Sequence, residues 1–157
     1  MSQSLSVAES LLVPVATEDA FRRTLPAPLP AVFRRWHGPI PPVREVRDQT
    51  GAWDAAGQTR TVQLAGGATM REELTSVQPP QSFGYRLTNI GGPMALLVDH
   101  VVGEWAFTPA PGGTEITWRW DIIPRSPLTS WAVPVFGRLW RGYARKALWD
   151  LSEVLTG

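Results

Sequence analysis

Three side chains in this sequence have the chemistry for proton transfer: the carboxyl group of Glu72, the imidazole of His100 and the phenol of Tyr85. An imidazole exchanges protons near neutral pH, and a carboxyl group or a phenol does so when its surroundings shift its pKa. We therefore take these three as the candidate catalytic residues. Whether each can act depends on the face of the strand that it occupies, because side chains alternate between two faces.

Glu72 lies in a strand expected at residues 69–77, where strict alternation turns it inward and turns its neighbour Glu73 outward. A buried carboxylate without a partner is costly. An inward Glu72 therefore needs a hydrogen bond, or an ion pair with an arginine such as Arg86 or Arg60. The alternative is a bulge or a strand end that exposes it.

The position of His100 depends on the regularity of its strand. In an unbroken strand, His100 lies on the face opposite Trp105 and Phe107, at the surface beside Asp99. A bulge at Gly103 would move His100 to the inner face, where its imidazole can act as a general base. Both arrangements stay open from the sequence.

The two tyrosines, Tyr85 and Tyr143, both fall on expected inner faces. A buried phenol needs a hydrogen-bond partner. Each hydroxyl therefore either orients a ligand carbonyl or bonds to backbone at a cavity rim. No serine–histidine–acid order, nucleotide-binding glycine loop or metal-ligand spacing stands out, so no cofactor and no metal site are expected.

The most regular element is the strand at residues 114–123, which alternates in residue type over its whole length. One face carries only large apolar residues: Ile116, Trp118, Trp120 and Ile122. After Pro124, residues 128–155 repeat apolar side chains with the period of an α-helix. A helix of this length measures about 40 Å and spans a strand of about 33 Å. We therefore expect a curved sheet that holds one long helix.

Six further strands are bounded by turn residues. They are expected at residues 5–13, 43–49, 59–65, 69–77, 82–89 and 98–108. Two short helices follow the first strand, one from Thr17 to before Pro26 and one at 29–36. Pro134 separates a leading segment, residues 128–133, from the main long helix.

The apolar inner faces of sheet and helix define the expected binding residues. They are Met70, Phe83, Tyr85, Trp105, Phe107, Trp118, Trp120, Phe136, Trp140 and Tyr143. So many aromatic rings either line a cavity or fill a core. Residues 94–97 form a hydrophobic loop that is a candidate lid over this space. Trp149 falls on the basic side of the helix, where it packs on a loop or contacts a second copy in a homodimer.

The bulk composition excludes several classes of function. The 157 residues carry a net charge of +1 without a block of like charge, so no nucleic-acid partner is expected. The absence of cysteine excludes disulfides and thiolate chemistry. The length fits one domain over residues 1–157. With no signal peptide and no long apolar run, we expect a cytoplasmic protein without stable membrane insertion.

The order of elements resembles the START/Bet v 1-like superfamily (SRPBCC) and its bacterial polyketide cyclase/dehydrase branch. The local matches are Pro79-Pro80 followed by Phe83-Gly-Tyr85, then Gly103-Glu-Trp105, and Gly112-Gly-Thr114 through Trp120. The resemblance implies an α+β helix-grip fold, with about seven antiparallel strands wrapped around the C-terminal helix. It also implies a cavity for a hydrophobic small molecule, because such proteins hold lipids, polyketides, hormones or quinones.

Three functions are compatible with this sequence. The first is a carrier or sensor that binds a hydrophobic small molecule and needs no catalyst. The second is a cyclase or dehydratase in which Glu72, His100 or Tyr85 moves a proton. The third is a protein-interaction module that uses the helix face formed by Arg138, Arg141 and Arg145 together with Trp149.

Overall fold

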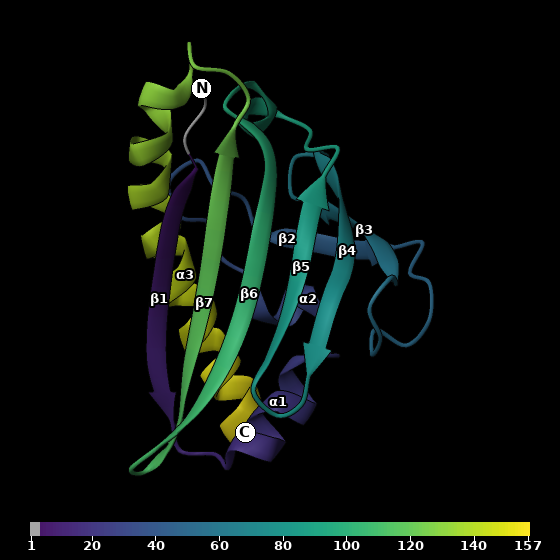
Figure 1. Ribbon diagram of the computed structural model, residues 1–157, viewed down its shortest axis with the longest axis vertical. Coiled ribbons are helices and arrows are strands. Elements are labelled where there is room, and N and C mark those ends of the chain that lie inside the picture. Colours follow the sequence, from purple (N-terminus) through teal and green to yellow (C-terminus); the bar gives the residue numbers. More distant parts are fainter. Residues whose placement is uncertain (1–3) are drawn as a thin grey trace.

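The computed structural model describes residues 4–157, in which seven strands form one antiparallel sheet in the order β1-β7-β6-β5-β4-β3-β2 (Figure 1). Their bounds are β1 Leu5–Val13, β2 Val43–Arg47, β3 Thr59–Leu64, β4 Thr69–Gln78, β5 Ser82–Thr88, β6 Val98–Ala110 and β7 Gly113–Pro124. From β2 to β7 each strand pairs with the next in sequence, and β1 pairs with β7. All seven expected strands are present, with ends that differ by one or two residues.

The helices are one long element and several short ones. Their bounds are α1 Thr17–Thr24, α2 Leu29–Val32, α3 Val133–Thr156 and the 3₁₀ turns η1 Pro93–Leu96 and η2 Ser130–Ala132. The long helix begins at residue 133 and not at 128, because Pro134 fits a first turn but lacks the N–H that a helix interior needs. The second short helix ends at Val32 and not at residue 36, since the backbone turns away at Phe33.

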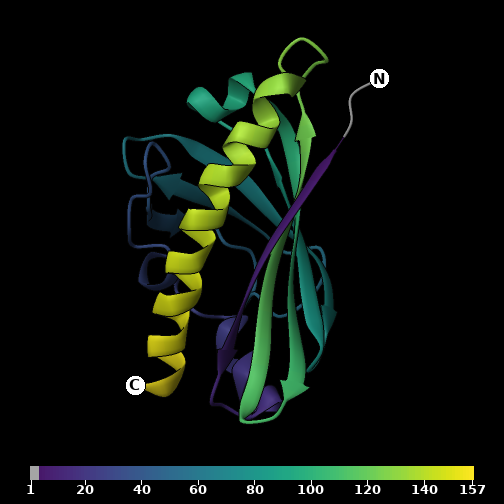
Figure 2. The same cartoon turned by 90° about the vertical axis from the view of Figure 1, so that its left-hand side faces the viewer.

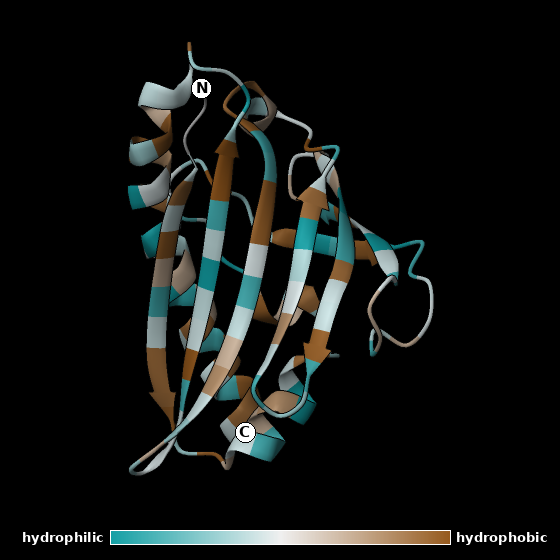
Figure 3. Ribbon diagram, viewed as in Figure 1, coloured by the Kyte–Doolittle hydropathy of each residue, from teal (hydrophilic) through white to brown (hydrophobic). Residues whose placement is uncertain are grey.

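Alternation along β6 and β7 gives the sheet one apolar face. Trp105 of β6 lies directly opposite Trp118 of β7, and Gly103 lies directly opposite Trp120. The three tryptophans are buried, whereas the side chain of Arg119, on the other face, is half exposed. Figure 3 shows the resulting bands of apolar and polar residues along these strands. The apolar face is the one on which α3 packs.

The long helix α3 crosses the sheet over β1 (Figure 2). Gly137 permits this approach, because a Cβ atom there would lie 2.9 Å from Leu5 Cδ2 and 3.2 Å from Val7 Cγ1. One and two turns further on, the guanidinium groups of Arg141 and Arg145 lie 3.6 Å and 2.9 Å from the carboxylate of Glu9 on β1. The helix is thereby fixed to the β1 edge of the sheet.

Residues 33–42, which we name the strap, connect α2 to β2 and are hydrogen-bonded to α3. Arg34 and Arg35 both donate to the carboxylate of Asp150, at 2.9 Å and 2.8 Å. Tyr143 donates its hydroxyl proton to the carbonyl oxygen of Pro41 at 3.1 Å. An irregular segment rich in proline is thus held against the helix by side-chain hydrogen bonds.

The helix-grip fold expected from the sequence is confirmed: a seven-stranded antiparallel sheet, two short helices after β1 and a long C-terminal helix. Its apolar interior lies between the sheet, α3 and the strap. Among residues 4–157, no helix is long and apolar enough to cross a membrane.

Candidate functional site

A cavity of about 510 Å³ lies between the inner face of the sheet, α3 and the strap. Its volume falls in the range of roughly 300–1,000 Å³ that is typical of small-molecule sites. Most of its lining side chains are apolar. The polar or hydroxyl-bearing exceptions are Thr24, Arg60, Glu72, Tyr85 and Tyr143. The wall is therefore apolar, with a few polar groups at fixed places.

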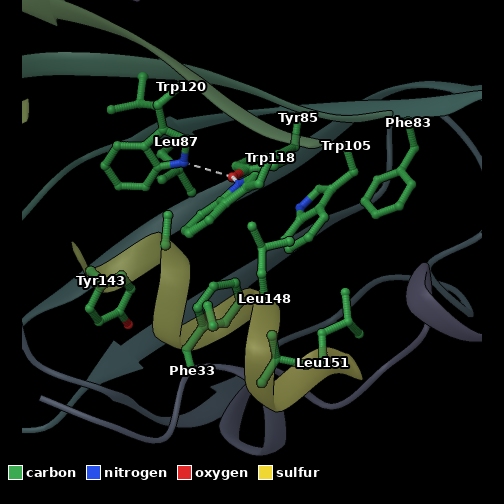
Figure 4. Packing of buried hydrophobic residues seen from close by; sticks show 14 of the residues in the cluster. Phe33, Phe83, Tyr85, Leu87, Trp105, Trp118, Trp120, Tyr143, Leu148 and Leu151 are labelled. Atoms are coloured by element: carbon green, nitrogen blue, oxygen red, sulfur yellow. Dashed lines mark hydrogen bonds between the residues drawn. The ribbon is translucent and has the colours of Figure 1, made fainter. Parts of the chain in front are cut away.

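Trp118 is at the centre of an aromatic wall. Its ring lies 5.2 Å from the ring of Trp105 in a nearly parallel stack, and 4.8 Å from the ring of Trp140 on α3. The ring of Phe33, the first residue of the strap, lies 5.0 Å away. Figure 4 shows the rings of Trp118, Trp105 and Phe33. Sheet, helix and strap thus meet on one indole ring.

Tyr85 of β5 reaches toward β7 by lying across Gly103 of β6. Gly103 is directly opposite Tyr85, and a Cβ atom at Gly103 would collide with the phenol ring. The space above Gly103 lets the Tyr85 oxygen accept hydrogen bonds from Trp118 Nε1 at 2.7 Å and from Trp120 Nε1 at 2.8 Å (Figure 4). Two indole N–H groups therefore point at a single oxygen in the cavity wall.

Glu72 of β4 faces the cavity and forms an ion pair with Arg60, the residue directly opposite it on β3. Arg60 Nε donates to Glu72 Oε1 at 2.8 Å, and both side chains are buried. The Arg60 guanidinium also lies over the ring of Trp53, 3.8 Å from its centroid, in a cation–π contact. Of the two partners expected for an inward Glu72, the structure supplies Arg60 and not Arg86.

Burial dominates the titration of the polar groups in the wall. Burial raises the pKa of Glu72, and the charge and hydrogen bond of Arg60 oppose this rise. Burial, together with the charge of Glu72, raises the pKa of Tyr85 well above its ordinary value. The pKa of Tyr143 is likewise raised by burial. Both phenols therefore remain protonated at physiological pH and can donate a hydrogen bond.

Nine of the ten predicted binding residues line this cavity: Met70, Phe83, Tyr85, Trp105, Trp118, Trp120, Phe136, Trp140 and Tyr143. Phe107 does not line it. Phe107 packs with Phe21 of α1 and with Phe83, at ring distances of 5.4 Å and 6.0 Å. Alternation correctly places Phe107 on the inner face of β6, but α1 packs over that end of the sheet, so the cavity does not extend to it. The role of the nine in binding stays a prediction.

His100 lies outside the cavity and is not brought together with the other two catalytic candidates. The pairing of β6 with β7 shifts between Val98 and His100, whereas Gly103 keeps a regular register. The irregularity is therefore at Asp99, and it leaves His100 partly exposed, with Nδ1 2.8 Å from Asp99 Oδ2. Among residues 4–157, no group of three histidine, cysteine or acidic side chains gathers at a place that could hold a metal ion.

The strap and the segment before α3 supply lining residues that alternation does not identify. They are Phe33, Pro39, Ile40, Pro41, Trp131 and Ala132. These segments have no period, and the density of proline next to apolar residues is their one signal in the sequence. Two buried polar atoms of the wall, Trp140 Nε1 and Thr24 Oγ1, have no hydrogen-bond partner among the described residues.

The cavity opens beside η1, at the N-terminal end of α3. Trp131 and Val135 line it there and are 76% and 55% exposed. The expected lid loop borders this opening, with Leu97 in the lining. The backbone N–H of Arg125 donates to the carbonyl of Leu97 at 2.9 Å, and its guanidinium donates to the carbonyl of Ala95. The loop is thus fastened to the residue that follows β7.

The fold and the cavity together define a helix-grip protein, in which a curved sheet and one long helix enclose an apolar space. The family described as polyketide cyclase / dehydrase and lipid transport matches residues 4–156, and the chain belongs to this family. No curated protein matches the sequence closely enough to serve as a relative.

Solved structures with the same fold include enzymes and other proteins. Norcoclaurine synthase from Thalictrum flavum, in complex with dopamine and hydroxybenzaldehyde, aligns with a TM-score of 0.73 at 12% identity, over 99% of this chain and 88% of that chain. The ginseng major latex-like protein 151 from Panax ginseng aligns with a TM-score of 0.67 at 10% identity, over 96% and 97%. The di-domain ARO/CYC protein BexL aligns with a TM-score of 0.69 at 16% identity, over 96% of this chain and 49% of that chain. At these identities the likeness concerns the fold alone.

Proposed function

We propose that the protein is a carrier or sensor that binds a hydrophobic small molecule, such as a lipid, a polyketide or a quinone, in the cavity under α3. One observation carries this proposal: a cavity of about 510 Å³ whose wall is apolar except at a few positions. A ligand that buries about 300 Å² of apolar surface gains ~7.5 kcal/mol before the costs of association. That gain supports binding in the micromolar range.

The direct test is native mass spectrometry of the protein purified from its own host, followed by extraction of whatever is released on denaturation. We expect a stoichiometric apolar small molecule. An empty protein that also shows no heat of binding with fatty acids, quinones and aromatic polyketides in calorimetry would contradict the proposal.

A cavity-filling variant tests whether such a molecule occupies this space. Met70 of β4 lines the cavity, so Met70→Trp adds an indole ring inside it. Glu73, also on β4, is exposed, and Glu73→Trp adds the same ring outside. We expect Met70→Trp to weaken binding by at least about tenfold and Glu73→Trp to leave it within about threefold. Equal affinities for the two variants would place the ligand elsewhere.

The enzymatic alternative is favoured by one feature, the buried carboxylate of Glu72 in the cavity wall. A cyclase or dehydratase would use it with Tyr85 to move a proton on a bound, reactive chain. In that case Glu72→Gln abolishes turnover while the substrate still binds. Norcoclaurine synthase, an enzyme with the same fold, was solved in complex with dopamine and hydroxybenzaldehyde. Its activity is compatible with chemistry in this fold, but it is a property of that protein.

The interaction alternative rests on the outer face of α3. Trp149 is exposed there, as the homodimer prediction requires, but Arg141 and Arg145 already contact Glu9 of β1. Arg138 is exposed. Loss of function in Arg138→Glu and Trp149→Ala, with ligand binding intact, would favour this alternative over the carrier.

A further inference from the structure

The hydrogen bonds of Tyr85 restrict what a ligand can offer at this point of the wall. A hydroxyl group donates one hydrogen bond and accepts two, whereas an indole N–H only donates. Trp118 and Trp120 therefore occupy both acceptor positions of the Tyr85 oxygen. The hydroxyl proton of Tyr85 has no acceptor among residues 4–157. At this hydroxyl group, only the O–H proton remains available to bond to a ligand.

A second unpaired donor belongs to the same cluster of rings. Trp140 Nε1 is buried and has no partner among the described residues. The Trp140 ring lies 4.8 Å from that of Trp118 and 5.6 Å from that of Trp120, the two rings that bond to Tyr85. Buried N–H groups in folded proteins are rarely left unpaired. Both residues line the cavity, but the Trp140 Nε1 atom itself is buried away from the open space.

The charges around this wall disfavour an anionic ligand. Arg60 is the one cation among the lining residues, and it is already bonded to Glu72 and lies over Trp53. The negative charge of Glu72 acts on the Tyr85 hydroxyl, which it helps to keep protonated. A ligand carboxylate at this place would be a second buried negative charge without a cation of its own. A neutral oxygen meets no such penalty.

We infer that the molecule held in this cavity carries an uncharged carbonyl oxygen, as in a ketone, a quinone or an ester, and that this oxygen accepts the hydrogen bond of Tyr85. The inference rests on the proposed function and narrows its ligand class. A pure hydrocarbon leaves the Tyr85 hydroxyl proton unpaired, and a ligand whose polar group can only donate meets a donor there.

A pair of compounds with the same shape tests this inference. Fluorenone and fluorene differ in one carbonyl group that replaces one methylene group. In calorimetry we expect fluorenone to bind at least about tenfold more tightly than fluorene. If fluorene binds within about threefold of fluorenone, the carbonyl inference is overturned and the carrier proposal stands. If neither compound binds, the inference and its premise of a small apolar ligand both fail.

Infrared spectroscopy of fluorenone labelled with carbon-13 at its carbonyl separates a hydrogen bond from a preference for shape. The carbonyl stretch of the bound compound should lie at a lower wavenumber than in cyclohexane. Tyr85→Phe should raise it, because an indole N–H freed by the substitution is a weaker donor than a phenol. Glu73→Gln is the control: Glu73 is exposed on β4 and does not line the cavity, so the band should stay in place. A bound carbonyl that absorbs as in cyclohexane would overturn the inference.

Discussion

Two carboxylates, Asp150 and Glu72, are buried among residues 4–157. They differ in how exposed their arginine partners are. Asp150 of α3 accepts hydrogen bonds from Arg34 and Arg35, whose side chains are 48% and 47% exposed. Glu72 in the cavity wall accepts from Arg60 alone, whose side chain is 6% exposed. The cations at Asp150 keep much of their hydration, while both members of the cavity pair lose theirs.

The two pKa values shift in opposite directions for this reason. Burial alone would raise the pKa of Asp150, but the hydrogen bonds and charges of Arg35 and Arg34 lower it below its ordinary value. Burial raises the pKa of Glu72 against the single partner Arg60. The arginines at the strap therefore favour the charged form of Asp150, whereas burial disfavours the charged form of Glu72. A group kept at a cost in a cavity wall points to a role in what the cavity holds.

The largest expected effect comes from breaking the cavity pair. Arg60→Met leaves the carboxylate of Glu72 buried without a cation. Its cost is limited to about 4 kcal/mol at pH 7, the free energy needed to protonate a glutamate of ordinary pKa ~4.3. The double variant Arg60→Met with Glu72→Leu should recover to within about 1 kcal/mol of the wild type. Urea unfolding measures both, and a double variant as unstable as the single one would contradict this account.

Breaking the ion pair between Asp150 and the strap should lower the free energy of unfolding by less. An apolar residue at position 150 should not restore that stability. Asp150→Asn removes the charge that holds Arg34 and Arg35, but both arginines can turn to water. We expect a loss of ~1–2 kcal/mol in the free energy of unfolding. Asp150→Leu should be at least as unstable as Asp150→Asn. If the leucine variant regains wild-type stability, the two sites do not differ as described.

The pH dependence of stability should distinguish the two carboxylates by its sign. The pKa of Asp150 is lowered, so its contribution is present above the unfolded value of ~3.9 and is lost as pH falls through the folded pKa. The pKa of Glu72 is raised, so stability from this group falls as pH rises from ~4.3 through the folded pKa.

Variants make this sign measurable in urea unfolding at a series of pH values. The stability difference between the wild type and Asp150→Asn should shrink in acid. Relative to Glu72→Gln, the wild type should lose stability as pH rises through its window. Parallel curves for all three proteins would show that neither carboxylate titrates with a shifted pKa.

The smallest effect is expected at a more exposed ion pair, which serves as a baseline. Glu9 accepts from Arg145 at 2.9 Å and lies 3.6 Å from Arg141, and its side chain is 15% exposed against 1% for Asp150. Glu9→Gln should change the free energy of unfolding by less than about 1 kcal/mol. A larger loss would mean that burial of the carboxylate is not what separates the strong pairs from the weak ones.

Much of the fold follows from alternation and period, because those patterns reflect which face of an element is buried. The tryptophans of β7 and their neighbours on β6 illustrate this, since a residue's face is fixed by its parity along the strand. Phe107 shows what parity cannot predict. Parity gives the face of the sheet on which Phe107 lies, but whether that position lines the cavity depends on packing with α1, which is distant in sequence. At His100 parity also indicates the face, because pairing is regular from His100 to Phe107 and the irregularity lies before His100.

The strap could not be predicted for a different reason. Its hydrogen bonds join Arg34 and Arg35 to Asp150, more than a hundred residues away, and no local pattern indicates which helix residue an arginine will meet. The inward position of Glu72 followed from parity, yet the choice of Arg60 over Arg86 depended on strand pairing. Both features are thus set by pairing between segments that are distant in sequence.

The position of Tyr85 over Gly103 links two residues that must change together. Any side chain at Gly103 would take the space of the phenol ring and would release both indole N–H groups from its oxygen. A chain that loses the glycine therefore has to lose the tyrosine first. Among natural variants of this protein, we expect glycine at 103 wherever tyrosine stands at 85, and a wider choice at 103 only in those where the residue at 85 is small.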